Sequence, residues 1–342
     1  MSLCRLSTLA VAAGLTLVLG CGTKVTSKTT STGAGGATST GTAATGTSSG
    51  TTGSGGAPPG TTALTASIGP IHVTPGEESV QCIVMNLGNT DASFVRRFKT
   101  TLATGTHHMI VYTTTDPENL TPTPCQSFAG ILTDHPIFIA QQAHSELDFP
   151  TDAASGSPVG LQLKTNQMLR LEMHFINPTM TPLDVTGTAE IDVLPSTANV
   201  IKSDLAFWGT EQFTIPPNAD ADTGMKFHAA LPGTHVFALT THQHQLGTEM
   251  QVWYADSVAD TSNRVADGTN WSNPPLELFS PPLDFPVGST KGFAYDCHWK
   301  NTTSNQVNFG EGFNNEMCFL WHYYYPSQGF QYCVDNVCAT KP

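Results

Sequence analysis

The sequence predicts an all-β fold from about residue 65 onward. Short runs rich in β-branched and aromatic residues recur there, among them HHMIVYTT, MLRLEMHFI and EMQVWYA, each bounded by Gly, Pro, Asn or Asp. Long segments with helical periodicity are absent from the sequence. In MLRLEMHFI the side chains alternate, which places Leu169 and Leu171 on one face of a strand and His174 on the other. These observations predict antiparallel strands packed as β-sandwiches.

The N-terminal segment 1–21 is predicted to be a lipoprotein signal peptide. Arg5 supplies a positive charge, and the apolar run after it is too short to span a membrane comfortably as a mature helix. The run ends Val-Leu-Gly-Cys, which resembles the bacterial lipobox and makes Cys21 the expected lipid attachment site. The alternative is a plain secretory signal in which Cys21 is incidental.

Residues 22–64 are almost wholly Gly, Ser, Thr and Ala, a composition that cannot bury a core and predicts a disordered linker. No second long apolar run follows, so we expect contact with a membrane through the lipid anchor only. Gly22, not Asp, follows the lipobox cysteine. This favours the outer membrane of the bacterial cell envelope as the location of an exported protein.

The globular part is predicted to form two domains, an N-terminal sandwich at 65–204 and a C-terminal sandwich at 205–342. Length alone allows two ordinary domains or one large one. The segment LAFWGTEQFTIPPNADADTG carries a Pro-Pro turn and an acidic stretch, as a connection between two sandwiches would. This segment places the boundary near residue 205.

Composition excludes one class of partner and indicates an oxidising compartment. The formal net charge of −13 argues against nucleic acid, because neutralising phosphates requires clustered Lys and Arg. Outside the signal segment the number of cysteines is even, which in an exported protein predicts three disulfides and leaves their pairing open. These cysteines are Cys82, Cys125, Cys297, Cys318, Cys333 and Cys338.

Twelve histidines are many for a chain with so few charged residues, and neutral histidine is the commonest metal ligand. On a strand, His242 and His244 project from the same face, close enough to chelate one ion. The alternative is a pair of polar side chains on a solvated face. Spacing alone leaves both interpretations open.

The other candidates are weaker when judged by position alone. Adjacent strand residues point to opposite faces, so His107 and His108 can share one ion only where the strand is twisted or irregular. Nothing local marks His174 as a ligand. Met317 would by default pack in a core.

Four motifs, GTHHMIVY, LRLEMHFINP, TTHQHQLG and NNEMCFLWHYYYP, follow one another along the chain. FTIPPN lies between the second and third of them. In order and approximate spacing they resemble the copper type II, ascorbate-dependent monooxygenases. The familiar members of this family are the peptidylglycine α-hydroxylating and dopamine β-monooxygenases. The resemblance spans residues 66–326, essentially the whole folded part.

This resemblance implies two tandem, jelly-roll-like antiparallel sandwiches that hold two copper ions per chain, one in each sandwich. His107, His108 and His174 are the implied ligands of an electron-delivering copper in the first. The two ions are expected to face each other across an open cleft.

His242, His244 and Met317 are the implied catalytic residues, as ligands of the copper that binds dioxygen. The soft thioether of methionine suits Cu(I), and zinc rarely takes such a ligand. The implied reaction places one oxygen atom of dioxygen on a C–H bond of a small-molecule substrate and reduces the other to water. An external reductant, ascorbate or another donor, supplies the electrons.

The resemblance also implies a disulfide pattern that would tie down both metal sites. One bridge would fix the backbone next to Met317, a second would flank the strand of His107, and the remaining two cysteines would close a short C-terminal loop. The implied pairs are Cys297–Cys318, Cys82–Cys125 and Cys333–Cys338.

Three positions depart from the peptide-amidating members and define a candidate substrate pocket. Thr240 stands where those enzymes carry an Arg that binds a carboxylate, and Phe319 and Trp321 replace their Asn and Tyr. We therefore expect a more apolar pocket and no peptidylglycine substrate, with core packing as the alternative role of both aromatic residues. His322 is a candidate for a residue that contacts a copper ligand and orients it without binding the copper itself.

Two other functions fit parts of the sequence. A non-catalytic copper-binding or electron-transfer protein would keep the ligands without substrate-dependent oxygen consumption. A structural or adhesive surface sandwich would bind no stoichiometric metal. The complete set of six implied ligands favours the monooxygenase, and the sequence indicates no oligomeric state.

Overall fold

The computed structural model describes residues 56–128, 130–335 and 337–341. This part of the chain consists almost entirely of β-strands and includes one short helix, α1 (Gly130–Thr133), which confirms the all-β fold. The predicted signal peptide, Cys21 and most of the predicted linker lie outside the described residues. The first strand begins at Thr62, so the prediction that the linker extends to residue 64 is wrong at its end. Within the described ranges, no helix is long and apolar enough to cross a membrane.

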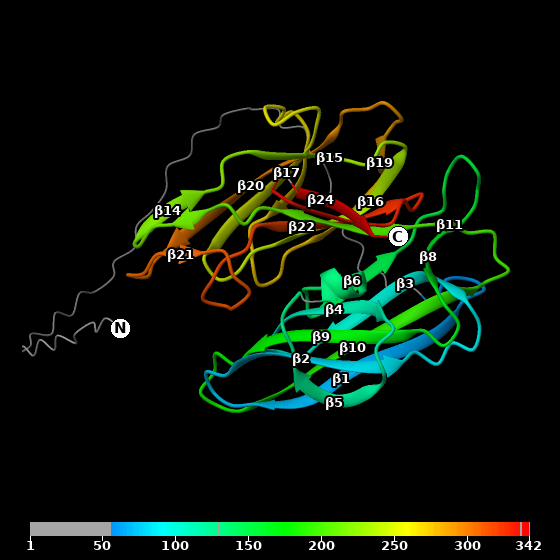
Figure 1. Ribbon diagram of the computed structural model, residues 1–342, viewed down its shortest axis with the longest axis horizontal. Coiled ribbons are helices and arrows are strands. Elements are labelled where there is room, and N and C mark those ends of the chain that lie inside the picture. The colour runs from blue at the N-terminus through cyan, green and yellow to red at the C-terminus, as the bar shows by residue number, and fades with distance from the viewer. Residues whose placement is uncertain (1–55, 129, 336, 342) are drawn as a thin grey trace, which may run out of the picture. The chain divides into compact units, whose positions relative to one another are not determined.

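The N-terminal strands form two facing sheets (Figure 1). In order across the first sheet, its strands are β1 (Thr62–Val73), β10 (Leu183–Pro195), β3 (Ser93–Leu102), β8 (Val159–Leu163) and β11 (Ile201–Lys202), with β7 (His144–Asp148) also paired to β3. The second sheet contains β5 (Asn119–Pro124), β2 (Glu78–Asn86), β9 (Met168–Ile176), β4 (Thr106–Thr114) and β6 (His135–Ala140). Except for the parallel pair β8 and β11, neighbouring strands are antiparallel.

The C-terminal strands form a second pair of sheets and a short ribbon. The first sheet contains β19 (Leu276–Phe285), β16 (Thr234–His242), β22 (Phe319–Tyr325), β12 (Asp204–Gly209), β23 (Phe330–Val334) and β24 (Val337–Lys341). The second contains β14 (Ala219–Asp222), β20 (Gly292–Asn301), β17 (Gly247–Ala255) and β18 (Arg264–Gly268), with β15 (Lys226–Ala229) also paired to β20. The ribbon pairs β13 (Thr214–Ile215) with β21 (Val307–Asn308).

The segment expected to connect two sandwiches is mostly strand. All six residues of β12 are buried, and β12 lies between β22, its antiparallel neighbour, and β23, its parallel one. The acidic run forms β14, which pairs with β20. The prediction of a connecting loop is therefore wrong for these residues. Strand partners nevertheless change between Lys202, which pairs with an N-terminal strand, and Asp204, which pairs with a C-terminal one.

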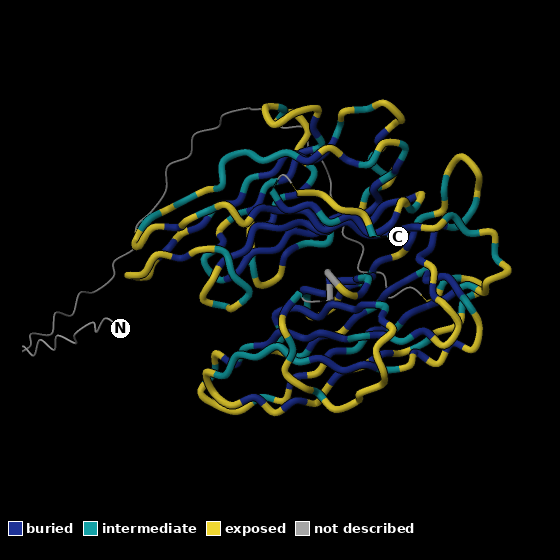
Figure 2. Tube along the Cα trace, in the orientation of Figure 1, coloured by how far each residue is buried: buried dark blue, intermediate teal, exposed yellow. Residues whose placement is uncertain are grey.

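Alternate side chains of β22 enter two different cores. Trp321 and Tyr323 belong to the large core of the N-terminal strands, whereas Leu320 and Tyr324 belong to the core between the C-terminal sheets. Strand residues alternate between faces, so a central strand covered on both sides joins two layers. Figure 2 shows the buried residues concentrated in the strands and the exposed ones in the turns.

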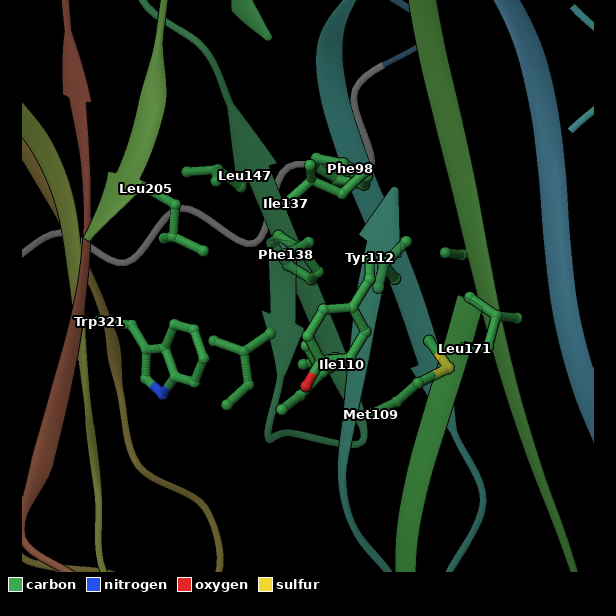
Figure 3. Close-up of a cluster of buried hydrophobic side chains, with 14 of the residues drawn as sticks. Phe98, Met109, Ile110, Tyr112, Ile137, Phe138, Leu147, Leu171, Leu205 and Trp321 are labelled. Carbon is green, nitrogen blue, oxygen red and sulfur yellow. The ribbon is translucent and has the colours of Figure 1, made fainter. Parts of the chain in front are cut away.

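The contact between the two groups of sheets is apolar and close. In Figure 3, Trp321 and Leu205 face Ile110 and Phe138 across this core. The hydroxyl of Tyr323 accepts a hydrogen bond from the backbone N–H of Ile139 at 3.2 Å. The sheet that contains β16 and β22 therefore packs directly on β4 and β6.

Three disulfides link the six cysteines in the pairs that the resemblance implied. Cys82–Cys125 ties the end of β5 to β2, the neighbour of β9. Cys297–Cys318 attaches the chain next to Met317 to β20. The third bridge joins β23 to β24.

Candidate metal centre

Five histidines gather where the two groups of sheets meet. His107 and His108 lie near the start of β4, His174 near the end of β9, and His242 and His244 at and just beyond the end of β16. All five are at most 5 % exposed. The centroid of the His107 ring lies 5.2 to 5.4 Å from the centroids of the other four rings. We call these five residues the histidine cluster.

An irregularity in β4 explains how two adjacent histidines both reach the cluster. Where β4 pairs with β9, Thr106 lies opposite Phe175 and His108 opposite His174, so that His107 is an extra residue in β4. Such a bulge redirects the side chain of the inserted residue. His107, His108 and His174 each place one ring nitrogen within 4.8 Å of the others. The strand irregularity that a metal site shared by His107 and His108 requires is therefore present in β4.

His107 belongs to a second group as well. Ring nitrogens of His107, His242 and His244 also lie within 4.8 Å of one another. The two implied ligand sets therefore meet at one residue, and the expected open cleft between them is wrong for this structure. The physical reason is the direct packing of the β16–β22 sheet on β4 and β6, which buries all five rings.

Gln141, just after β6, orients His242. The Nδ1–H of His242 donates to Oε1 of Gln141 at 2.5 Å. The amide nitrogen of Gln141 donates to Oγ1 of Thr240 at 3.0 Å and to the carbonyl oxygen of Thr241 at 2.9 Å. A ring held through Nδ1 presents Nε2 to a metal. Thr240 thus lies in this network, although the sequence suggested it for the substrate pocket.

Hydrogen bonds through one ring nitrogen also orient the rings of His244 and His174. The Nδ1–H of His244 donates to the carbonyl oxygen of Asn315 at 3.0 Å. The Nε2–H of His174 donates to Oε1 of Glu78 at 2.9 Å. That carboxylate oxygen also accepts the backbone N–H of Phe313 at 2.6 Å, so Glu78 connects β2 to a loop of the C-terminal half.

Six buried ring nitrogens of the histidine cluster have no hydrogen-bond partner among the described residues. They are His107 Nε2, His108 Nδ1 and Nε2, His174 Nδ1, His242 Nε2 and His244 Nε2. Burial, the largest cause, lowers the pKa of His107, His108 and His242 well below the usual value and that of His244 to about 4. Buried unpaired nitrogens are costly, and a neutral imidazole is the form that binds metal. The residues present therefore fit bound copper.

Two buried carboxylates lie behind the cluster. Glu172 accepts the backbone N–H of Phe128 at 3.0 Å, and Glu316 accepts the backbone N–H of His244 at 3.0 Å. Burial, the largest cause in each case, raises the pKa of both carboxyl groups to about 7. Each carboxyl fixes a backbone segment at the centre, and Glu316 does so next to Met317.

Met317 lines a cavity of about 190 Å³ that adjoins the histidine cluster. Phe128 lines the same cavity, and its ring centroid lies 5.2 Å from that of His108 and 5.7 Å from that of His242. Phe319, one of the predicted pocket residues, also lines this cavity. Trp321 does not, and packs behind the wall, which is the alternative role considered for it.

Sequence reasoning missed three residues that support the centre. Gln141 and Glu78 lie 101 and 96 residues from the histidines they hold, so no local motif marks them. Glu316 could have been identified from the sequence, because it immediately precedes Met317 in one of the four motifs.

Replacing Gln141 should weaken the His242–His244 group. Gln141→Leu removes the hydrogen bond that sets the ring orientation of His242, and copper affinity should fall about 10- to 100-fold. Competition with a copper chelator measures this, with the half-buried neighbour Gln142→Leu as control. Unchanged affinity in Gln141→Leu would show that this contact does not orient the ring.

His322 lies away from the centre, in the core between the C-terminal sheets. Its ring centroid is 4.4 Å from that of Trp208 and 5.3 Å from that of Phe293. Its Nδ1 is buried without a hydrogen-bond partner among the described residues. The suggested support of a copper ligand is therefore not its role in this structure.

His322 should make the fold sensitive to acid. Burial lowers its pKa to about 3, so below pH 6.5 the unfolded chain binds a proton that the folded protein does not. The stability present above pH 6.5 is lost as the pH falls towards 3, by about 2 kcal/mol at pH 5. Urea unfolding of His322→Phe at pH 7 and pH 5 should lack this loss, while the exposed control His144→Gln should retain it. An equal pH dependence in both variants would refute the assignment.

Comparison with known proteins agrees with the chemistry of the centre. The family model for the copper type II ascorbate-dependent monooxygenase C-terminal domain matches residues 209–341. These residues include His242, His244 and Met317. No curated protein matches the chain.

Among solved structures, the chain is similar to the major capsid protein P2 of bacteriophage PM2. The TM-score is 0.34 and the identity 8 %, over 77 % of this chain and 97 % of that chain. The STIV MCP gives a TM-score of 0.32 and 10 % identity, over 77 % and 95 % of the two chains. At these TM-scores the likeness supports no conclusion about this protein. The match at residues 209–341, in contrast, identifies that part of the chain as similar to the C-terminal domain of the copper type II ascorbate-dependent monooxygenases and supports the resemblance drawn from the motifs.

Proposed function

We propose that this protein is a copper-dependent monooxygenase that hydroxylates a C–H bond of a small organic substrate, using dioxygen and an external one-electron reductant. The observation that carries the proposal is the histidine cluster, whose buried ring nitrogens lie close together and include six without a hydrogen-bond partner among the described residues. The family match supports it independently. We assign two copper ions per chain, one to His107, His108 and His174 and one to His242, His244 and Met317.

Bound copper would supply one-electron redox chemistry and an open coordination position for dioxygen. The residues of the chain prepare the site for it. Burial keeps the imidazoles neutral, so that their nitrogens are available as ligands. Gln141 and Glu78 hold two of the rings through the far nitrogen, and the packed sheets keep bulk water away.

The cavity beside Met317 is the proposed substrate site. Its walls include five aromatic rings, and the rings of Phe207 and Phe319 stack with centroids 4.5 Å apart. Its volume of about 190 Å³ suits a small molecule with an apolar or aromatic body. This supports the more apolar pocket expected from Phe319.

Charge around the cavity favours a cationic over an anionic substrate. Glu211 and Glu311 line it, and no Lys or Arg is among its described lining residues. Burial, the largest cause, raises the pKa of both carboxyl groups, so a positively charged group on a bound substrate would stabilise each carboxylate. A substrate carboxylate would meet repulsion here, whereas an amine would meet attraction.

Substrate-dependent oxygen consumption tests this proposal. Protein loaded with copper and supplied with ascorbate should consume dioxygen on addition of a phenylalkylamine, and hydroxylated product should form in equal amount. The corresponding phenylalkanoic acid, added at the same concentration, should be a much poorer substrate, by about tenfold or more. Bound copper without substrate-dependent oxygen uptake would favour the copper-binding or electron-transfer alternative. Absence of bound copper would favour the structural or adhesive sandwich.

We also propose that the protein works in the bacterial cell envelope, exported and held by a lipid on Cys21. The lipobox-like sequence supports this location. The disulfides suit it too, since such bonds persist in oxidising compartments.

A further inference from the structure

A second, larger cavity lies away from the histidine cluster. Its volume is about 640 Å³, within the usual range for sites of small organic ligands. Thr113 and Thr114 line it at the end of β4, whereas His107 and His108 lie near the start of that strand. The cavity is therefore separate from the proposed copper centre.

Both halves of the protein and the junction between them build this cavity. Lys164 comes from the N-terminal strands and Lys341 from β24, while Lys202 and Ser203 form the junction itself. The backbone N–H of Ser327 donates to the carbonyl oxygen of Lys202 at 2.6 Å and closes one side. A ligand here would contact both halves at once.

Positive charge is concentrated in this cavity. Three lysines line it in a chain that has 14 Lys and Arg in total and a net charge of −13. The ammonium group of Lys341 donates to the carbonyl oxygen of Asp134 at 2.7 Å. The ammonium groups of Lys164 and Lys202 take part in no ion pair or hydrogen bond with the described residues.

The acidic residues of the cavity are already paired with groups of the protein. Asp134 accepts a contact from Arg170 at 2.8 Å. Asp204 lies 2.8 Å from the ring of His135 and accepts the hydroxyl of Ser327 at 2.8 Å. These pairs leave the charges of Lys164 and Lys202 without a counter-ion among the described residues.

One polar group of the cavity is buried without a partner. Ser203 is 3 % exposed, and its hydroxyl oxygen has no hydrogen-bond partner among the described residues. A buried hydroxyl without a partner is unfavourable unless a ligand or water satisfies it. Ser203 lies in the junction next to Lys202 and is among the residues that line the cavity.

We propose that this cavity binds a small hydrophilic organic anion through its carboxylate or phosphate oxygens. Lys164 and Lys202 would supply the charge, and the hydroxyl of Ser203 would donate a hydrogen bond. Few apolar side chains, among them Ile137 and Leu161, line the cavity, so an apolar ligand would gain little. Because the ligand would bind the folded protein and not the unfolded chain, binding also raises the melting temperature.

Isothermal titration with citrate and with glucose 6-phosphate tests the proposal. At least one probe should bind saturably, more weakly at higher NaCl concentration, and equally in copper-free and copper-loaded protein. The probe that binds more tightly identifies the carboxylate or the phosphate as the preferred group. No saturable binding of either probe up to about 10 mM would overturn the proposal.

Three variants locate the site. Lys202→Gln should weaken binding about tenfold or more, and Lys300→Gln, which removes an equal charge at an exposed position of β20, should not. Ser203→Ala should weaken binding about fivefold without lowering the melting temperature of the ligand-free protein, because its hydroxyl has no partner to lose. Equal losses in Lys202→Gln and Lys300→Gln, or full affinity in both cavity variants, would refute the site. None of these residues touches the copper centre, so this result is independent of hydroxylase activity.

Discussion

His107→Ala should remove more copper from the protein than the loss of any other single histidine. His107 is a proposed ligand of the first copper, and its ring nitrogen also lies within 4.8 Å of those of His242 and His244, so the substitution removes a ligand from one group and a packed neighbour from the other. Loss of a residue that only orients a ligand costs 10- to 100-fold, so loss of this ligand should cost its own group more than about 100-fold in affinity and should also weaken the His242–His244 group. Copper per chain and competition with a Cu(I) chelator measure the effect.

His174→Ala is the matched comparison for this experiment. His174 is equally buried but belongs to one group only, so its loss should spare the affinity of His242 and His244. The exposed His144→Ala should retain all the copper of the unmodified protein. Equal copper losses in His107→Ala and His174→Ala would contradict the shared position of His107.

Met317→Leu should abolish hydroxylation while leaving the fold intact. Leucine replaces a buried methionine at similar volume, so the free energy of unfolding should change by less than about 1.5 kcal/mol. The thioether is lost, and with it a soft ligand that favours Cu(I). Cu(I) affinity should fall more than Cu(II) affinity, and substrate-dependent oxygen consumption should fall at least about 100-fold.

Met250→Leu controls for the change of side chain. Met250 is also fully buried but lies in the core between the C-terminal sheets, away from the cavity that Met317 lines. Its substitution should alter neither copper affinity nor oxygen consumption. A Met317→Leu protein with unchanged Cu(I) affinity would show that the sulfur is not a ligand.

The fold class and most of the candidate residues could be predicted from the sequence, because both depend on local order along the chain. Alternation along a strand assigns Leu171 and His174 to opposite faces of β9 without knowledge of any neighbour. In the same way, the spacing of two residues predicts that His242 and His244 project from one face. The motifs indicated the family, and the match at residues 209–341 agrees. Local order led to a wrong prediction at β12. A strand that is buried on both faces shows no alternation, so its sequence resembles a connecting segment.

How the two halves meet could not be predicted from the sequence, because it depends on contacts between residues far apart in the chain. The place of His107 in both groups depends on the packing of the β16–β22 sheet against β4 and β6, which no motif encodes. Gln141 became part of the centre in the same way, through hydrogen bonds to residues about 100 positions away. The lysines of the second cavity are likewise distant in sequence and adjacent only after folding. Periodicity reports which face a side chain occupies, whereas its partner across an interface is set by sheet packing.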